Sequence, residues 1–151
     1  MAHYAPHVPL QATKKYLDLY SGIELEQQRI YAAMVSALDD SVGAIKAKIT
    51  EEGLAQKTLI IFLSDNGCAI YTQGACTNSP LSGGKRYQLE GGVRVPYIMH
   101  WPVTIPKTRF ESMVSSLDIV PTILAASGIE VTSEDRIDGV DLIKFLRGED
   151  K

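Results

Sequence analysis

Long apolar runs and a strong net charge are both missing from this 151-residue sequence, and each absence excludes a class of protein. No segment approaches the roughly 20 consecutive apolar residues of a membrane-spanning helix. The formal net charge of -3, spread over interspersed signs, provides no basic surface for nucleic acid or anionic lipid. We therefore expect neither a nucleic-acid partner nor a membrane partner. The 45% hydrophobic content suits a single globular domain over residues 1–151.

Cysteine is also scarce, since Cys68 and Cys76 are the two in the sequence. They can form a disulfide in an oxidising compartment or stay reduced in the cytosol, and their spacing leaves both states open. The sequence has no further Cys or His pair at ligand spacing, which argues against a zinc site.

Residues Met1–His7 contain no basic and apolar signal segment, so the sequence predicts no location for this chain.

The most informative segment is an apolar run that ends in polar residues. Five large apolar residues, Leu59–Leu63, are followed after one serine by Asp65, Asn66 and Gly67. The run is short for a helix and predicts a strand buried on both faces, as in the parallel sheet of an α/β domain. Its carboxyl end is where open α/β sheets bind ligands, and carboxylate and amide oxygens suit Ca²⁺ or Mg²⁺. A metal-free Asx turn explains the same residues about equally well.

A long helix is predicted before this strand. An S-x-x-E capping box at Ser21–Glu24 begins it, and Gly53 follows its end. Apolar residues recur between them at three- and four-residue steps: Ile30, Met34, Leu38, Val42, Ile45 and Ile49. The expected length is roughly 28 to 32 residues, or about 45 Å. Asp39 and Asp40 point about 100° apart on its polar face, so we expect solvated side chains rather than a shared metal ion.

Before this helix, residues 1–20 are predicted to be loop and short turn. His7 lies between Pro6 and Pro9, which fix the backbone around it. A rigidly held loop histidine can act on a ligand, although a structural role is the commoner explanation for a single histidine.

After the predicted strand, residues 67–92 lack any period, contain six glycines and are predicted to be a loop. Loops of this length inside a compact domain are usually either functional or disordered. Glycines beside Lys85 and Arg86 let backbone amides approach an anion. A second strand is predicted over Val93–Trp101, with Pro96 at its beginning or at a sheet edge.

Two helices are predicted in the last third of the chain. Asp118 is expected to cap the first, which has Pro121 in its first turn and Gly128 after its end. Asp141–Arg147 is expected to form the second, a short helix or turn.

Together these segments resemble the carboxyl-terminal half of the large domain of sulfatases, within the alkaline-phosphatase-like superfamily. The matching segments occur in the family's order over nearly the whole chain: Ala5–Gln11, Leu38–Gly43, Phe62–Gly67, Gly83–Lys85, Glu90–Pro96, His100–Pro102, Ser116–Thr122 and Asp138–Leu142. The resemblance implies an α/β fold in three layers, a partial alkaline-phosphatase-like sheet flanked by helices.

The resemblance also implies roles for four residues. Asp65 and Asn66 are similar to two of the family's four Ca²⁺ ligands. Lys85 resembles the lysine that contacts the sulfate, and His7 the histidine that helps the ester oxygen to leave. A divalent ion and a lysine stabilise charge on sulfuryl oxygens, and an imidazole can donate a proton. The implied substrate of a complete family enzyme is a sulfate ester, and its implied location is periplasmic or secreted.

The sequence departs from the family at the nucleophile. Sulfatases use a formylglycine made from the first residue of a C/S-x-P-x-R motif, whereas here Cys68 is followed two positions later by Ile70, and Cys76 by Asn78. The acidic pair that supplies the other two metal ligands and the small carboxyl-terminal subdomain are also absent. We therefore expect a fragment of a sulfatase catalytic domain that is inactive alone and binds Ca²⁺ weakly.

Exposed sheet edges or helix faces of such a fragment favour association, so we also expect a homo-oligomer. Two other functions stay open. One is a non-enzymatic interaction module derived from a sulfatase, and the other is a related metallo-hydrolase such as a phosphatase or phosphonate hydrolase. Asp65 followed by Asn66 argues against a zinc phosphomonoesterase, because the amide oxygen suits Ca²⁺ better than Zn²⁺.

Overall fold

The computed structural model describes residues 1–149. The chain divides into two compact units. The first comprises Met1–Glu52 and Phe62–Ile98, and the second comprises Gly53–Ile61 and Met99–Lys151, of which the part up to Glu149 is described. One domain over residues 1–151 stays a prediction.

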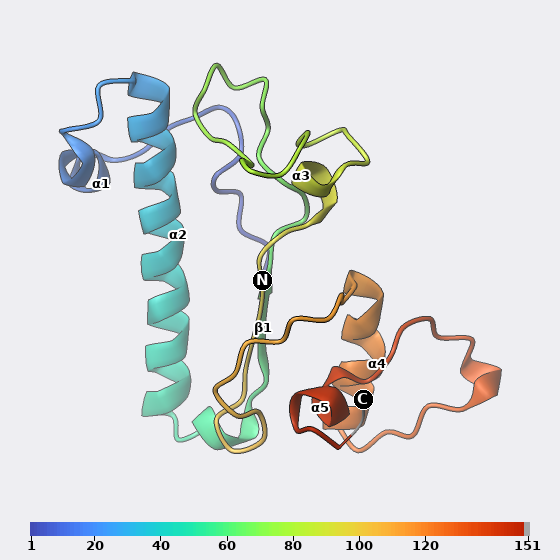
Figure 1. Ribbon diagram of the computed structural model, residues 1–151. Helices are drawn as coiled ribbons and strands as arrows, with labels where there is room; N and C mark the ends of the chain where they lie inside the picture. Colours follow the sequence, from blue (N-terminus) through green and yellow to red (C-terminus); the bar gives the residue numbers. More distant parts are fainter. Residues whose placement is uncertain (150–151) are drawn as a thin grey trace. The chain divides into compact units, whose positions relative to one another are not determined.

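Helix α2, Glu26–Glu51, is the longest element of the first unit and has 26 residues (Figure 1). The predicted capping box at Ser21–Glu24 is wrong, because Leu25 is extended (φ -73, ψ 111) and the helix begins after it. The predicted end is confirmed, since Gly53 lies just beyond the helix with a φ of 68. Residues 1–20, predicted to be loop and turn, include the short helix α1, Lys14–Leu17, and the 3₁₀ turn Asp18–Tyr20.

Helix α1 packs against α2 through polar contacts of Lys15 and Tyr16. The Lys15 ammonium and the Tyr16 hydroxyl each donate a 2.9 Å hydrogen bond to the Asp40 carboxylate on α2. Hydrogen bonds from Lys15 and then from Tyr16 lower the pKa of the Asp40 carboxyl below its ordinary value. The predicted exposure of Asp39 and Asp40 is confirmed.

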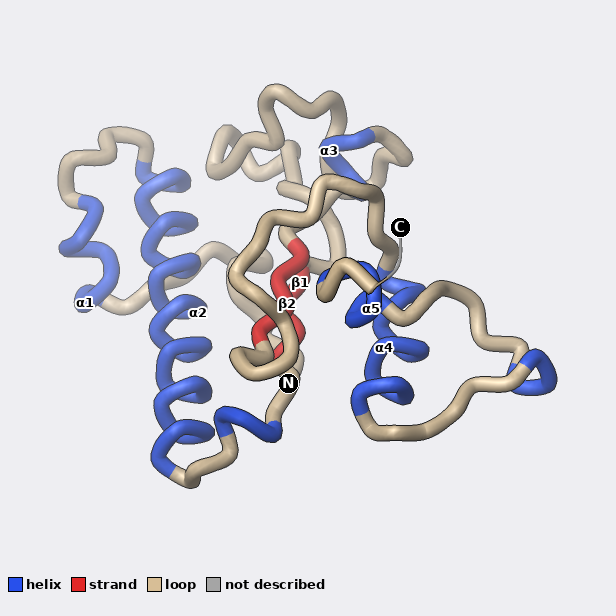
Figure 2. Tube along the Cα trace, turned by 60° about the horizontal axis from the view of Figure 1, so that its bottom comes forward, coloured by secondary structure: helices blue, strands red, loops and turns tan. Residues whose placement is uncertain are grey.

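Strands β1, Ile60–Leu63, and β2, Tyr97–His100, form a two-stranded sheet (Figure 2). The Ser64 amide donates to the Pro96 carbonyl at 3.3 Å just beyond the pair, as expected for antiparallel strands. The prediction of a doubly buried strand in a parallel sheet is wrong for residues 1–149. Strand β1 has β2 as its one strand neighbour there, and all four β1 residues are partly exposed.

The second predicted strand, Val93–Trp101, begins later than expected. Residues Glu90–Val93 form the short helix α3, and β2 starts at Tyr97, directly after Pro96. The position of Pro96 at the beginning of the strand is therefore confirmed. Helix α3 lies beside the loop that follows β1. The Gly67 amide in this loop donates a hydrogen bond to the Gly92 carbonyl of α3 at 2.9 Å.

The second unit contains helix α4, Ile119–Ala126, and helix α5, Leu142–Leu146. It also contains the 3₁₀ turns Ala55–Lys57, Ser116–Asp118 and Ser133–Asp135. Leu142 and Ile143 of α5 are buried beside Thr122 of α4, whose side chain is fully buried. The Thr122 hydroxyl accepts a 3.0 Å hydrogen bond from the Leu142 amide, which ties the two helices together.

The predicted ends of these helices are confirmed in part. Gly128 follows α4 with a φ of 72, and the Asp141 carboxylate caps α5 by accepting from the Ile143 amide at 2.9 Å. Asp118 directly precedes α4 but makes no side-chain cap with it, so its predicted role is wrong. Among the helices of residues 1–149, none combines the length and apolarity needed to cross a membrane.

Candidate functional site

Asp65 and Asn66 form the turn at the carboxyl end of β1, as the sequence predicts. The Ser64 hydroxyl donates a 2.7 Å hydrogen bond to the Asn66 carbonyl and so closes the turn through its backbone. Asp65 is exposed and Asn66 is partly buried, and within residues 1–149 neither side chain makes a hydrogen bond or ion pair. An Asx turn would require one of these side chains to accept from the backbone. The side-chain oxygens of both residues are instead free to bind a cation.

Gly67 allows the chain after Asn66 to approach another segment closely. A Cβ atom at Gly67 would lie 1.8 Å from the Gly91 carbonyl oxygen, far inside the limit for non-bonded atoms. This position therefore requires glycine, because any side chain would push α3 away from the turn.

Lys85 comes from the glycine-rich loop and lies against the same turn. Its amide donates a 3.0 Å hydrogen bond to the Cys68 carbonyl, three residues after Asp65. Gly84 is buried there, and a Cβ atom on it would lie 2.4 Å from the same carbonyl oxygen. The Lys85 side chain is partly exposed, and its ammonium makes no ion pair or hydrogen bond within the described part of the chain.

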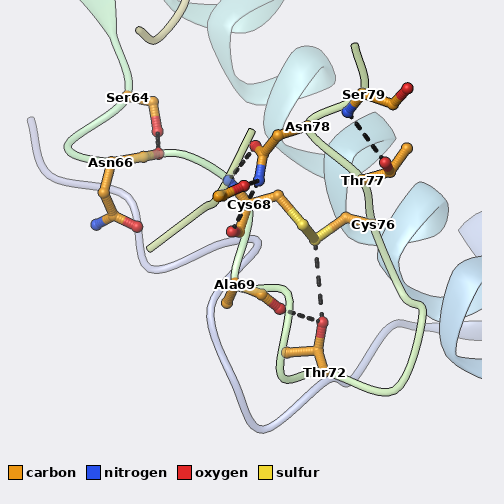
Figure 3. Close-up of a disulfide and its surroundings, with 10 residues drawn as sticks. Ser64, Asn66, Cys68, Ala69, Thr72, Cys76, Thr77, Asn78 and Ser79 are labelled. Atoms are coloured by element: carbon orange, nitrogen blue, oxygen red, sulfur yellow. Dashed lines mark hydrogen bonds between the residues drawn. A yellow bond between two sulfur atoms is a disulfide. The ribbon is translucent and has the colours of Figure 1, made fainter. Parts of the chain in front are cut away.

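Asn78 holds this region together, and sequence reasoning gave it no role (Figure 3). Its Oδ1 accepts from the Cys68 amide at 2.7 Å, and its Nδ2 donates to the Cys68 carbonyl at 3.2 Å and to the Gly83 carbonyl at 3.0 Å. The sequence contains one available signal, an asparagine followed by glycines in a long loop without periodicity. Side chains in such loops commonly pair with backbone groups that have no partner in a helix or sheet.

Cys68 and Cys76 form a disulfide with a Cα–Cα distance of 6.0 Å, which settles the two states that the sequence left open. The bond closes a small ring whose first residue, Cys68, is also the one that Asn78 and Lys85 contact. The Thr72 hydroxyl donates to the Ala69 carbonyl at 2.7 Å within the ring (Figure 3).

His7 is exposed on the amino-terminal loop of the same unit. Its Nδ1 lies 2.7 Å from the Val8 carbonyl oxygen, which can only accept a hydrogen bond, so Nδ1 carries a proton. Nε2 has no partner within residues 1–149 and is the atom available for proton transfer. The Tyr4 ring lies 5.3 Å from the imidazole, and the Tyr4 hydroxyl donates to the same Val8 carbonyl.

The structure thus places all four predicted site residues in the first unit. Cys68 brings the Lys85 segment against the turn that holds Asp65 and Asn66. Within residues 1–149, no hydrogen bond joins His7 to that cluster, and no group of three or more His, Cys, Asp or Glu side chains is placed to hold a metal ion.

Comparison with known proteins gives the family. The sulfatase family model matches residues 1–129. The chain belongs to the sulfatase family. N-acetylgalactosamine-6-sulfatase from Sus scrofa is 35% identical over 146 residues, covering 94% of this chain. Steryl-sulfatase from Mus musculus is 36% identical over 126 residues, covering 79% of it.

Solved sulfatase structures share the fold. The crystal structure of Ps i-CgsB is similar to 99% of this chain with a TM-score of 0.91 and 35% identity. The PsFucS1 sulfatase from Pseudoalteromonas sp. is similar to 93% of it, with a TM-score of 0.76 and 33% identity. These similarities confirm the predicted α/β, partial alkaline-phosphatase-like fold and the resemblance to sulfatases.

The chain matches only a part of each of these proteins. It covers 27% of the Sus scrofa enzyme, 20% of the Mus musculus enzyme and 33% of the Ps i-CgsB chain. The activity, substrates and partners of the whole proteins are therefore matters for proposal.

Proposed function

We propose that this sulfatase chain carries part of the metal and sulfate site of a sulfuric ester hydrolase and does not hydrolyse sulfate esters by itself. The observation that carries the proposal is the 3.0 Å hydrogen bond from the Lys85 amide to the Cys68 carbonyl. It holds a free lysine beside the turn that presents the free oxygens of Asp65 and Asn66. A cation and a lysine held near each other suit the binding of an anionic sulfate group.

Each residue has a chemical task in this proposal. The Asp65 carboxylate and the Asn66 amide oxygen would hold Ca²⁺, which prefers oxygen ligands. The ion supplies positive charge that stabilises the sulfuryl oxygens. The Lys85 ammonium binds the same anionic group. The imidazolium of His7 donates a proton from Nε2 to the departing ester oxygen.

The isolated chain is expected to bind Ca²⁺ weakly, because two ligands are far from the six to eight oxygens that the ion takes. The test is a CaCl₂ titration followed by NMR of the Asn66 side-chain amide. We expect a dissociation constant on the order of 10⁻³ M or weaker for the wild type. The response should disappear in Asp65→Ala and persist in Asp39→Ala, which removes an exposed aspartate of α2. An equal response in both variants would refute the metal site.

Inactivity is tested with a chromogenic aryl sulfate and the matching aryl phosphate. The expected result is no hydrolysis of either ester above a Lys85→Ala control, because neither cysteine begins the family's nucleophile motif. Sulfate release that Lys85→Ala abolishes would contradict this part of the proposal. Phosphate release alone would favour a related phosphatase.

A second candidate function is a homo-oligomeric interaction module. Among the described residues the buried hydrophobic side chains are Ala33, Met34, Ala75, Leu142 and Ile143, which is a small core for a chain of this length. Large apolar side chains are exposed on several elements, including Val93 at 63% on α3 and Ile98 at 57% on β2. Exposed apolar surface favours association. Light scattering at tens of micromolar tests this, and a monomer mass would exclude it.

The disulfide also supports a proposed location. Disulfides persist in oxidising compartments, so we infer a periplasmic or extracellular location for the protein that contains this sequence. Thiol titration of protein taken directly from its native cells tests the inference. Two free thiols per chain would contradict it.

A further inference from the structure

The side-chain amide of Asn78 both accepts and donates hydrogen bonds. Oδ1 accepts from the Cys68 amide, while Nδ2 donates to two carbonyls, those of Cys68 and Gly83. A planar amide is the small neutral group that offers an acceptor and two donors in one plane. Leucine or alanine at this position would leave the Cys68 amide and the Gly83 carbonyl without a partner, and would leave the Cys68 carbonyl with the Lys85 amide alone. Buried backbone groups without partners are costly, at about 1–3 kcal/mol each.

The three bonds connect the two segments that carry the candidate site. Cys68 lies two residues after Asn66, and Gly83 lies two residues before Lys85. The Cys68–Cys76 disulfide does not reach the Gly83–Lys85 segment. The remaining direct tie is the single hydrogen bond from the Lys85 amide to the Cys68 carbonyl. Within residues 1–149, Asn78 is thus the side chain that hydrogen-bonds to both segments.

We propose that Asn78 is a positioning residue, whose amide fixes the location of Lys85 relative to Asp65 and Asn66. This rests on the proposed function of Lys85 in binding sulfate. Asn78 itself does not touch the anion. It hydrogen-bonds to the Gly83 carbonyl and to the Cys68 backbone at the same time, so that the Lys85 side chain starts from a fixed point beside the cation ligands.

Two substitutions separate the amide's functions. Asn78→Ala removes all three hydrogen bonds. Asn78→Asp keeps the acceptor for the Cys68 amide but directs a carboxylate oxygen at two carbonyls, which repel it. Protonation of that carboxyl restores one donor. The matched control is Thr77→Val, because Thr77 is an exposed neighbour whose hydroxyl accepts from the Ser79 amide and touches neither segment.

The first measurement is amide hydrogen exchange at Lys85. We expect exchange to become at least about tenfold faster in Asn78→Ala, as one hydrogen bond loses its support, and to stay unchanged in Thr77→Val. Amides of Ala33 and Met34 in α2 should keep their protection and so report that the fold is intact. If Asn78→Ala does not fold, Asn78→Asp at neutral pH provides the same comparison. Unchanged exchange at Lys85 would overturn the proposal.

The second measurement is binding of inorganic sulfate, followed by the NMR signal of the Lys85 ammonium. We expect affinity about tenfold weaker in Asn78→Ala than in the wild type. For Asn78→Asp, the ratio of its affinity to that of the wild type should rise as the pH falls through the range in which an aspartate titrates. Equal affinities of wild type and Asn78→Ala, or a ratio independent of pH, would overturn the proposal.

The two measurements also separate the inference from the function on which it rests. A wild-type chain that shows no sulfate response refutes the proposed role of Lys85, and with it the sulfate-binding part of the inference. The exchange rates then still decide whether Asn78 holds the Lys85 segment in place.

Discussion

The Asp118 carboxylate accepts a 2.9 Å hydrogen bond from the amide of Val140, which lies 22 positions further along the chain. Its other oxygen accepts from the Ser115 amide at 2.7 Å. Asp118 is only 6% exposed, so two backbone donors, rather than water, stabilise this carboxylate. Asp118 therefore joins the segment before α4 to the segment before α5.

Replacing this carboxylate should destabilise the second unit. Asp118→Asn keeps one acceptor but turns an NH₂ group toward the other backbone donor, and we expect a loss of about 1.5–3 kcal/mol in the free energy of unfolding. Urea denaturation measures it. Asp138→Asn is the control, since Asp138 is exposed in the same unit. Equal effects of the two substitutions would show that the bonds to Ser115 and Val140 contribute nothing.

Two glycine substitutions should have opposite effects. Gly67→Ala places a methyl group 1.8 Å from the Gly91 carbonyl oxygen, so we expect destabilisation of about 3 kcal/mol or more. Gly43 lies inside α2 with no atom within 4 Å of an added Cβ, so Gly43→Ala should stabilise the chain by about 0.5–1 kcal/mol. Thermal unfolding of both variants tests the pair. Tolerance of Gly67→Ala would contradict the close approach of α3 to the turn.

Loss of the disulfide should lower the free energy of unfolding, and the size of the loss should depend on the length of the loop that the disulfide closes. For the ring closed by Cys68 and Cys76, loop-closure entropy gives about 2–3 kcal/mol. The double substitution Cys68→Ser and Cys76→Ser, measured by urea denaturation, should show this loss. A reducing agent should lower the stability of the wild type equally and leave the double variant unaffected. A reductant effect on the double variant would mean that the loss has another cause.

The Asp40 contact predicts a pH dependence. Its pKa is lowered in the folded state by Lys15 and then by Tyr16, so its contribution to stability is complete above the unfolded pKa and is lost as the pH falls through the folded value. The pKa of Lys15 is raised, chiefly by Asp40, so its contribution is lost only as the pH rises through that raised value. Asp40→Asn should therefore lower the urea midpoint at pH 7 and make no difference in strong acid.

The matched control for this prediction is Asp39→Asn. Asp39 is the exposed neighbour on α2 and makes no hydrogen bond or ion pair within residues 1–149. Its midpoint should match the wild type at both pH values. A difference between Asp40→Asn and wild type that persists at low pH would assign the effect to something other than the charge of Asp40.

Local patterns predicted the elements that depend on local forces. The period of α2, its end at Gly53 and the strand after it follow from hydrophobic spacing and backbone preference, which nearby residues determine. The partner of β1 did not follow from its sequence. A short apolar run fits a parallel or an antiparallel sheet, and the choice depends on β2, more than 30 residues away in the chain.

The candidate site was predictable from local patterns at Asp65, Asn66 and His7, whereas the role of Lys85 came from the family resemblance. Asp65 and Asn66 follow β1 as expected, and Lys85 lies against the same turn, although no local pattern predicts that contact. The sequence did not predict the role of Asn78, because its three partners are backbone groups. Every residue has such groups, so no side-chain pattern identifies the contact. Asp118 was assigned to α4, whereas its carboxylate accepts from the Ser115 amide three residues before it and from the distant Val140 amide. The Val140 contact is recognisable only in the folded chain.

The disulfide ring has an exposed tip and a base that contacts the Lys85 segment. Its tip turns through Gln73 and Gly74, both exposed and both with positive φ, while Cys68 at its base is held by Asn78. Exposed residues at the tip other than Gly74, whose positive φ favours glycine, can therefore be exchanged without displacing the Lys85 segment. Descendants of one ancestral gene could acquire new recognition surfaces there while keeping Asp65, Asn66 and Lys85 unchanged.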